Sequence, residues 1–199
     1  MRPYIVEFTG TPEAGKTTSI LKTISILQSR GYNVGYVRES AEIAPNCIPK
    51  GSWHSNIWMR CITIAKTLEM AYSTQYDIVI CDRGPLDGLF FGYKYLAEGS
   101  CTAEEVNHYM SFIDQSRIQP DTLIALYTTP EEAIKRRGGE GRIVTKKWVD
   151  EYNSLLIPFY NELKVNKSWI DTTGKSREQV KDILVDLIES KLKEFKSAQ

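Results

Sequence analysis

The sequence predicts an α/β fold with a mainly parallel sheet, because short β-branched and aromatic runs alternate with stretches of helical spacing. The first run ends at a glycine and is followed at once by a helical stretch. The run at 76–82, YDIVICD, is apolar almost throughout, as expected for a strand covered on both faces. The expected strands are residues 4–8, 33–38, 76–82, 121–128 and 168–174.

Apolar residues at helical spacing predict the helices between these strands. From residue 16 to residue 30, apolar residues recur at helical spacing, at Ile20, Leu21, Ile24 and Leu27. Gly31 follows where a C-terminal cap belongs. Further helical stretches are expected at 57–72, 84–99 and 146–163, and an amphipathic helix after residue 176.

Three segments carry signals for a helix start. Thr102 with Glu105, and Ser176 with Gln179, have the spacing of a capping box. Thr129 is a capping residue that precedes a proline, which favours the first position of a helix. We therefore expect helices to begin after each of these residues.

Charge and hydropathy exclude several classes of partner. Lys plus Arg and Asp plus Glu each number 25, so the net charge is zero, whereas proteins that bind long nucleic acids carry a basic surplus. No apolar run approaches the ~20 residues that span a membrane, and no signal segment opens the chain. We expect one domain over residues 1–199, in the cytoplasm, with neither a long nucleic acid nor a membrane as partner.

The four cysteines, at positions 47, 61, 81 and 101, do not have the spacing of a zinc site. We expect reduced, structural thiols. Cys61 and Cys81 lie in apolar runs, where a thiol behaves as a small hydrophobic side chain.

Residues 8–18, FTGTPEAGKTT, form the most specific motif, and they match the pattern G-x-x-x-x-G-K-[ST] between an expected strand and an expected helix. Glycines let the backbone curl so that successive N–H groups face one phosphate, and the helix N-terminus adds its dipole. The lysine reaches the outer phosphates and the threonine hydroxyl binds Mg²⁺. A glycine turn with a chance lysine is the alternative. The motif predicts a site for ATP and Mg²⁺ formed by Gly10, Glu13, Ala14, Gly15, Lys16, Thr17 and Thr18.

Charged residues follow three of the expected strands, at the edge where ligands of parallel sheets gather. Asp82 follows an apolar strand and is expected to hold Mg²⁺ together with Thr17. Glu39 is expected to polarise an acceptor hydroxyl or to share the metal, and Arg83 to meet the acceptor. Asp171 ends the last strand. A turn aspartate and a solvated loop acid are the alternatives for Asp82 and Glu39.

The segment RRGGEGR, at 136–142, is expected to be a lid over about residues 136–145. Arginines on a glycine-rich hinge suit a segment that closes over a transferring phosphoryl group. Arg136, Arg137 and Arg142 are the candidates, and Glu13 is expected to point to solvent or toward one of them. A solvated basic loop is the alternative.

The motifs GTPEAGKTT, VRES, CDRG, RRGGEGR and DTTG, one after each strand in turn, resemble those of the P-loop nucleoside and nucleotide kinases, above all the thymidylate kinase and deoxynucleoside kinase group. The resemblance implies a three-layer α/β/α fold with a five-stranded sheet in the order 2-3-1-4-5, and a possible homodimer. It implies acceptor roles for Glu39, Asp82 and Arg83. It also implies that Thr173, Gly174 and Lys175 lie against adenine.

Two departures leave the acceptor unidentified. RESAE stands where thymidylate kinases resemble REPGG, and Gly84 stands where deoxynucleoside kinases tend to have serine. Trp53 and Trp58 could stack on a base and Arg60 could meet a phosphate, or the tryptophans are core and Arg60 is on the surface. Asp87 is expected near the same rim.

Three functions follow from the phosphate motif. The first is transfer of the γ-phosphoryl group of ATP to a nucleoside or nucleoside monophosphate, with Lys16, Glu39, Asp82, Arg83, Arg137 and Arg142 as catalytic residues. The second, a GTPase switch, is disfavoured because NKSW places Trp169 where N-K-x-D needs an aspartate. The third, an ATPase or regulatory nucleotide-binding module without a small acceptor, stays open.

Overall fold

The computed structural model describes residues 2–141 and 144–198, and its centre is a five-stranded parallel sheet in the order β2-β3-β1-β4-β5. The strands are β1 Tyr4–Gly10, β2 Val34–Val37, β3 Ile78–Asp82, β4 Thr122–Tyr127 and β5 Lys167–Asp171. The α/β class and the strand order are therefore as predicted. Each predicted strand is present, with ends that differ by a few residues.

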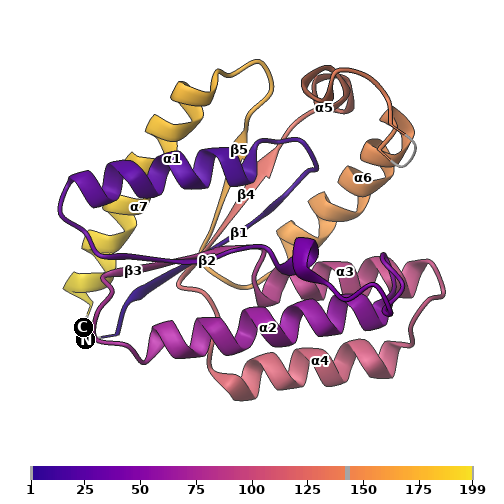
Figure 1. Cartoon of the computed structure of the whole chain (residues 1–199), viewed down its shortest axis with the longest axis horizontal. Coiled ribbons are helices and arrows are strands. Elements are labelled where there is room, and N and C mark those ends of the chain that lie inside the picture. Colours follow the sequence, from indigo (N-terminus) through magenta and orange to yellow (C-terminus); the bar gives the residue numbers. More distant parts are fainter. Residues whose placement is uncertain (1, 142–143, 199) are drawn as a thin grey trace.

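Helices cover both faces of the sheet (Figure 1). They are α1 Lys16–Ser29, α2 Trp53–Ala71, α3 Pro85–Ala97, α4 Ala103–Ser116, α5 Pro130–Arg137, α6 Lys146–Glu162 and α7 Arg177–Ser197, with a 3-10 turn at Ser40–Ile43. Helices α1 and α7 share one apolar cluster with the sheet, while α2, α3, α4 and α6 build a second cluster. Within the described ranges, no helix is both long enough and apolar enough to cross a membrane.

Strand β1 is the central strand and is buried along its whole length. Tyr4, Val6 and Phe8 point into the cluster shared with α1 and α7. Because side chains alternate along a strand, Glu7 and Thr9 point to the opposite face, toward α3. One face of this central strand is thus apolar, and the other brings an acid and a hydroxyl to the base of the candidate site.

The helix starts follow their capping residues. The two predicted capping boxes, at Thr102 and Ser176, are present, and Thr129 caps α5. Helix α2 begins at Trp53, four residues before the predicted start, because the Ser52 hydroxyl accepts the backbone N–H of Ser55 at 3.1 Å. This places the acceptor-side candidates Trp53, Trp58 and Arg60 on one helix.

Helix α2 turns a polar stripe inward, which corrects one expectation. Its buried residues include Asn56, Arg60, Thr63 and Thr67, at helical spacing. Cys61 therefore lies on the outer side and is exposed, whereas Cys81 in β3 is buried as expected. The apolar run did not reveal which face of this helix is buried. The buried face is polar, and its Arg60 lies beside the buried carboxylate of Asp87.

Strands β1 and β4 lie so close at Gly10 that a side chain does not fit there. A Cβ atom would stand 2.0 Å from the backbone oxygen of Leu126, and φ is +135°. We expect Gly10→Ala to lower the free energy of unfolding by at least about 3 kcal/mol, because strain adds to a clash with backbone. Urea unfolding measures this.

The matched control is Gly31→Ala. Gly31 also has a positive φ, +91°, but a Cβ atom there would meet nothing within 4 Å. We expect a loss of only about 1–2 kcal/mol from backbone strain. Equal losses in the two variants would contradict the close approach at Gly10.

Candidate functional site

The glycine-rich loop joins the end of β1 to the start of α1, as the motif predicts. The Nζ atom of Lys16 donates to the backbone oxygens of Gly10 at 3.0 Å and Thr11 at 2.8 Å. Glu13 and Gly15 both have positive φ, 62° and 83°, so the loop curls back over the start of the helix. A loop curled in this way can direct successive backbone N–H groups at one anion.

Lys16 is buried although it carries no carboxylate partner within hydrogen-bond distance in the described chain. Burial, and then the neighbouring Arg83, lower the pKa of Lys16 to about 7. A polyphosphate beside Nζ would oppose both effects, because an adjacent anion favours the ammonium form. Lys16 is therefore placed to gain its full charge when an anion binds.

Thr17 and Asp82 meet at the carboxyl end of β3. The Thr17 hydroxyl donates to Oδ2 of Asp82 at 2.6 Å, and Oδ1 of the same buried carboxylate has no hydrogen-bond partner in the described chain. No group of three or more His, Cys, Asp or Glu side chains in the described ranges has the geometry of a metal site. Thr17 and Asp82 offer adjacent oxygen atoms, which are ligands of the kind that a hard divalent cation such as Mg²⁺ could use.

Arg83 lies at the centre of the candidate site with a strained backbone, φ 64°. Its Nε is 2.9 Å from Oε1 of Glu39, and its Nη1 donates to Oδ1 of Asp87 at 3.0 Å. The hydroxyl of Tyr152 lies 3.4 Å from the same nitrogen. Residues from the loop after β2, from α3 and from α6 thus converge on one guanidinium group.

Asp87 is fully buried and balances two arginines. It accepts from the Thr9 hydroxyl at 2.6 Å, and its Oδ2 lies 3.6 Å from Nη2 of Arg60. Burial alone would raise the pKa of Asp87, but Arg83 and Arg60 hold it below its ordinary value. Asp87 is therefore an ionised member of the site, deeper than the rim position that was expected.

Arg60 lies neither on the surface nor at a place where it could meet a phosphate, the two positions considered from the sequence. It is 2% exposed, and its Nη1 donates to the backbone oxygens of Arg83 at 2.8 Å and Gly84 at 3.1 Å. Trp53 is core, as one alternative held, and Trp58 is partly exposed. Arg60 braces the turn after β3 because buried carbonyl groups there need donors.

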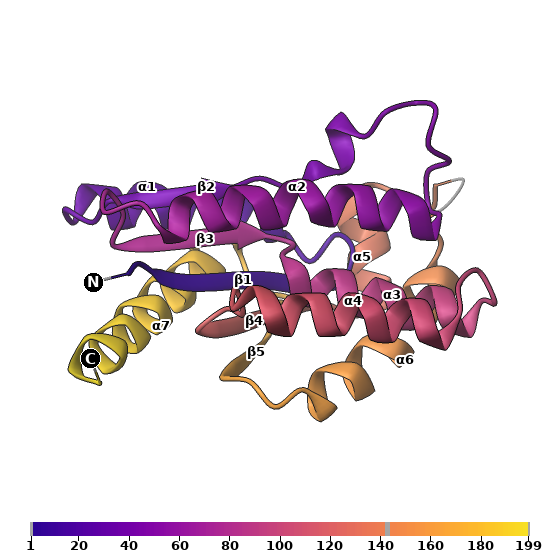
Figure 2. The ribbon, with the colours of Figure 1, turned by 90° about the horizontal axis from the view of Figure 1, so that it is seen from below.

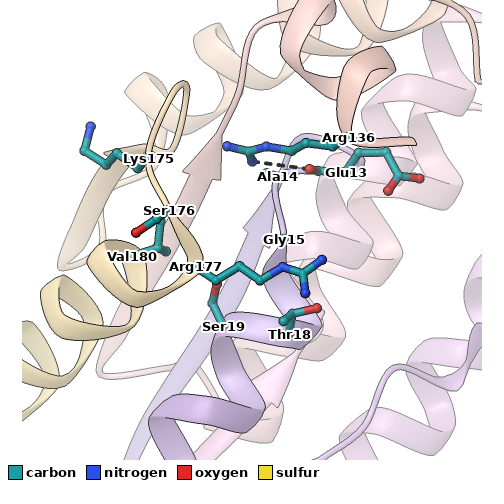
Figure 3. A pocket seen from close by; sticks show the side chains of 10 residues that line it. All are labelled: Glu13, Ala14, Gly15, Thr18, Ser19, Arg136, Lys175, Ser176, Arg177 and Val180. Carbon is teal, nitrogen blue, oxygen red and sulfur yellow. Dashed lines mark hydrogen bonds between the residues drawn. The ribbon is translucent and has the colours of Figure 1, made fainter. Parts of the chain in front are cut away.

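Two pockets flank the loop. One, of about 330 Å³, brings Glu39 and Arg83 next to Lys16 and Thr17. The other, of about 350 Å³, lies between the loop, α5 and the start of α7 (Figure 3). Its ten lining residues are Glu13, Ala14, Gly15, Thr18, Ser19, Arg136, Lys175, Ser176, Arg177 and Val180. The predicted acceptor residues Glu39 and Arg83 therefore share one pocket with Lys16 and Thr17, while Lys175 lies in the other pocket.

The three arginines expected in a lid differ in their surroundings. Arg136 is held against two loops. Its Nη2 donates to the backbone oxygen of Thr172 at 2.5 Å. Its Nη1 donates to the backbone oxygen of Glu13 at 3.4 Å (Figure 3). Arg137 pairs with the Glu13 carboxylate at 3.2 Å, one of the two orientations expected for Glu13. Arg142 lies outside the described residues.

The loop after β5 carries the residues expected against adenine. Lys175 lines the larger pocket. The Thr173 hydroxyl accepts the backbone N–H of Thr129 at 3.1 Å, and Gly174 has φ 68°. Asp171 is exposed and accepts the backbone N–H of Thr173 at 2.8 Å. Asp171 therefore shapes its own loop and does not join the central cluster.

Asn153 of α6 is a site neighbour that the sequence analysis missed. Its Oδ1 accepts from the Thr11 hydroxyl at 2.6 Å, and its Nδ2 donates to the backbone oxygen of Thr128 at 3.1 Å. It joins the helix after the lid to the phosphate loop and to the end of β4. An asparagine on an amphipathic helix gives no signal of this in the sequence, since only the fold makes it face inward.

Glu7 was also missed, although an acid inside the apolar run YIVEF was a visible signal. It is 1% exposed, and its carboxylate accepts the backbone N–H groups of Leu86 at 3.2 Å and Asp87 at 2.6 Å. Burial raises the pKa of Glu7 to about 8, against the effect of these two hydrogen bonds. A second buried carboxyl group thus stands beneath Asp87.

Comparisons with known proteins identify the fold. No protein-family model matches the chain, and no curated protein matches it in sequence. The structure of deoxyadenosine kinase from M. mycoides with bound dCTP aligns with a TM-score of 0.68 at 18% identity, over 94% of this chain and 99% of that one. The structure of the same kinase with the products dCMP and a flexible dCDP gives a TM-score of 0.69 at 18% identity, with 94% and 99% coverage. At this identity the match confirms the predicted P-loop kinase fold.

The position of Glu7 predicts a pH dependence of stability. The folded chain keeps the Glu7 proton up to about pH 8, whereas the unfolded chain loses it near the ordinary pKa of 4.5. Between these values the folded state binds more protons, so its stability falls as pH rises, by up to about 1.4 kcal/mol per pH unit. Glu7→Gln should remove this part of the slope in urea unfolding at pH 5, 6 and 7.

The two proteins are compared only up to pH 7, because above that pH the titration of Lys16 changes the stability in the opposite direction. Its pKa is about 7 when folded and 10.5 ordinarily, so it makes stability rise with pH across that range. Equal slopes for the two proteins between pH 5 and pH 7 would mean that Glu7 is ionised in the folded state.

Proposed function

We propose that the chain is a kinase that transfers the γ-phosphoryl group of ATP to a hydroxyl group of a small molecule, with a nucleoside as the favoured acceptor. One observation carries the proposal. Lys16 and Thr17 of the phosphate loop share a pocket with Glu39 and Arg83, so a phosphate-binding group and a carboxylate–arginine pair face the same space. The fold shared with deoxyadenosine kinase supports this function.

The side chains divide the reaction between them. The backbone N–H groups of the loop and Lys16 hold the phosphates of the donor. Glu39 accepts the proton of the acceptor hydroxyl while the acceptor oxygen bonds to the γ-phosphorus and the bond from that phosphorus to the β–γ bridging oxygen breaks. Arg83 orients Glu39 through their 2.9 Å ion pair. ADP leaves with the bridging oxygen.

Thr17 and Asp82 would hold Mg²⁺. The unpartnered Oδ1 of Asp82 and the adjoining Thr17 hydroxyl are oxygen ligands of the kind this ion prefers. When bound, the ion neutralises charge on the β- and γ-phosphate oxygens.

The charges around Arg83 favour a neutral acceptor over a nucleoside monophosphate. Glu39 and Asp87 both lie within 3.0 Å of the guanidinium, so little positive charge is left for a further anion. A hydroxyl also needs a base to remove its proton, and Glu39 is one. A thymidylate kinase-like acceptor, which brings its own phosphate, fits this arrangement less well.

The pocket in Figure 3 is the proposed place of the adenosine part of the donor. Thr173, Gly174 and Lys175 would lie against the base. Arg137 and Arg142 would close over the phosphates with the lid, since cationic groups stabilise charge that develops on the transferring group. The homodimer stays a prediction, which size-exclusion chromatography with light scattering tests.

The experiment that decides the function is a screen of nucleosides, nucleoside monophosphates and other small hydroxyl compounds with ATP and Mg²⁺. The measured quantity is ADP release that depends on the acceptor. We expect release with nucleosides. Release that no acceptor changes would favour the alternative, an ATPase or regulatory nucleotide-binding module.

Lys16→Ala tests the phosphate site. We expect acceptor-dependent ADP release to fall at least about 100-fold, because the variant loses the ammonium group that would bind the outer phosphates. Lys22→Ala is the matched control, since Lys22 lies on the exposed side of the same helix and pairs with Glu178. Normal turnover of a folded Lys16→Ala protein, judged by circular dichroism, would refute the site.

Glu39→Gln tests the proposed base. We expect kcat to fall by about 10²- to 10⁴-fold while the Kd for ATP changes little, because an amide keeps the shape but accepts no proton. Glu69→Gln, an exposed acid on α2, is the control. Equal losses in kcat and ATP affinity would instead assign Glu39 to the metal.

A further inference from the structure

Helix α3 begins without a side chain of its own to cap it. Gly84 occupies the capping position, and Pro85 follows at the first position of the helix. The next two backbone N–H groups, those of Leu86 and Asp87, have no partner within the helix and need an acceptor. Glu7 of β1 supplies it, with Oε1 at 2.6 Å from the nitrogen of Asp87 and Oε2 at 3.2 Å from that of Leu86.

The side chain of Glu7 leaves no room for a side chain at position 84. Its φ of −96° is open to any residue, so the backbone conformation does not require glycine. A Cβ atom at this position would, however, lie 2.5 Å from Cδ and from Oε2 of Glu7. Residues on a central strand and at the start of a distant helix are therefore matched to one another.

The start of α3 determines the geometry of Arg83 at both of its ends. Arg83 directly precedes Gly84 and has the strained φ of 64°, while its backbone N–H donates to the oxygen of Phe8 at 3.0 Å. Its guanidinium donates to Asp87, whose own N–H is the one that Glu7 accepts. A shift of the first turn of α3 would therefore move Arg83 and its partner together.

We infer that Glu7 is a positioning residue for the phosphoryl transfer proposed above. With Gly84 it fixes the first turn of α3, so that Arg83 and Asp87 stand at the acceptor side of the phosphate loop. Glu7 contacts neither of the two pockets that flank the loop, so it acts through Asp87 and not on a substrate.

A double-mutant cycle of four proteins tests the pair: wild type, Glu7→Ala, Gly84→Ser, and both changes together. Serine is a preferred capping residue, and the backbone at Gly84 is close to the extended conformation that caps adopt at Ser52 and Thr102. In the Gly84→Ser single variant, the new side chain clashes with the side chain of Glu7. In the double variant, alanine at position 7 leaves the serine hydroxyl room to accept the backbone N–H of Asp87.

We expect each single variant to unfold at a lower temperature than wild type, and the double variant to recover most of that loss. The amide NMR signals of Arg83 and Asp87 should shift in each single variant and return toward their wild-type positions in the double variant. With the acceptor found in the screen, kcat should fall about 10- to 100-fold in the single variants, because displaced catalytic groups act poorly. The Kd for ATP should change less than about threefold, since the phosphate loop keeps its own contacts.

If the double variant loses as much unfolding temperature as the two single variants together, the pairing of Glu7 with Gly84 is wrong. Unmoved Arg83 and Asp87 signals in folded single variants would overturn the positioning role and leave a purely stabilising one. If Glu7→Ala does not fold by itself, a folded double variant would support the pairing, and a double variant that also fails to fold would overturn it. An inactive wild type would refute the kinase proposal alone, because the unfolding and NMR measurements need no turnover.

Discussion

The charge of Arg83 has to be balanced inside the protein, and much of the site follows from that constraint. Arg83 is 8% exposed, and a buried charge without a partner costs several kcal/mol. Asp87 and Glu39 provide the balance, at 3.0 Å and 2.9 Å. Asp87 can do so only if α3 starts where it does, and Glu39 only if the loop after β2 turns toward β3. One guanidinium group thereby links the loop after β2 to helices α3 and α6.

Two polar side chains attach helices α5 and α6 to the loop after β1 and to the loop after β5. Arg136 donates to the backbone oxygens of Thr172 and Glu13, and Asn153 accepts from the Thr11 hydroxyl. These contacts come from the helices on either side of the glycine-rich segment. These two helices are thus fixed to the loop, while Arg137 makes an exposed ion pair with Glu13.

Particular elements show how far the sequence could predict this protein. The phosphate loop, the Thr17–Asp82 pair and the placing of Glu39 beside Arg83 follow from local motifs and from the rule that the carboxyl ends of parallel strands lie at one edge. The inward face of α2 could not be predicted in this way. Asn56 donates to the backbone oxygen of Gly88, and Arg60 donates to backbone oxygens in the turn after β3, and no local pattern reveals these partners. The apolar run around Cys61 led us to expect a buried thiol there, whereas Cys61 is exposed.

The sequence by itself determined the layered fold, the strand order through the resemblance it carries, and the loop that would hold phosphate. These depend on periodicity, turn chemistry and a contiguous motif, all of which are local. Only the tertiary structure decided that Glu7 lies under the first turn of α3, that Arg60 braces the turn after β3, and that Asn153 contacts the phosphate loop. The reason is physical: a buried polar side chain is defined by the partner that satisfies it, and that partner is distant in the chain.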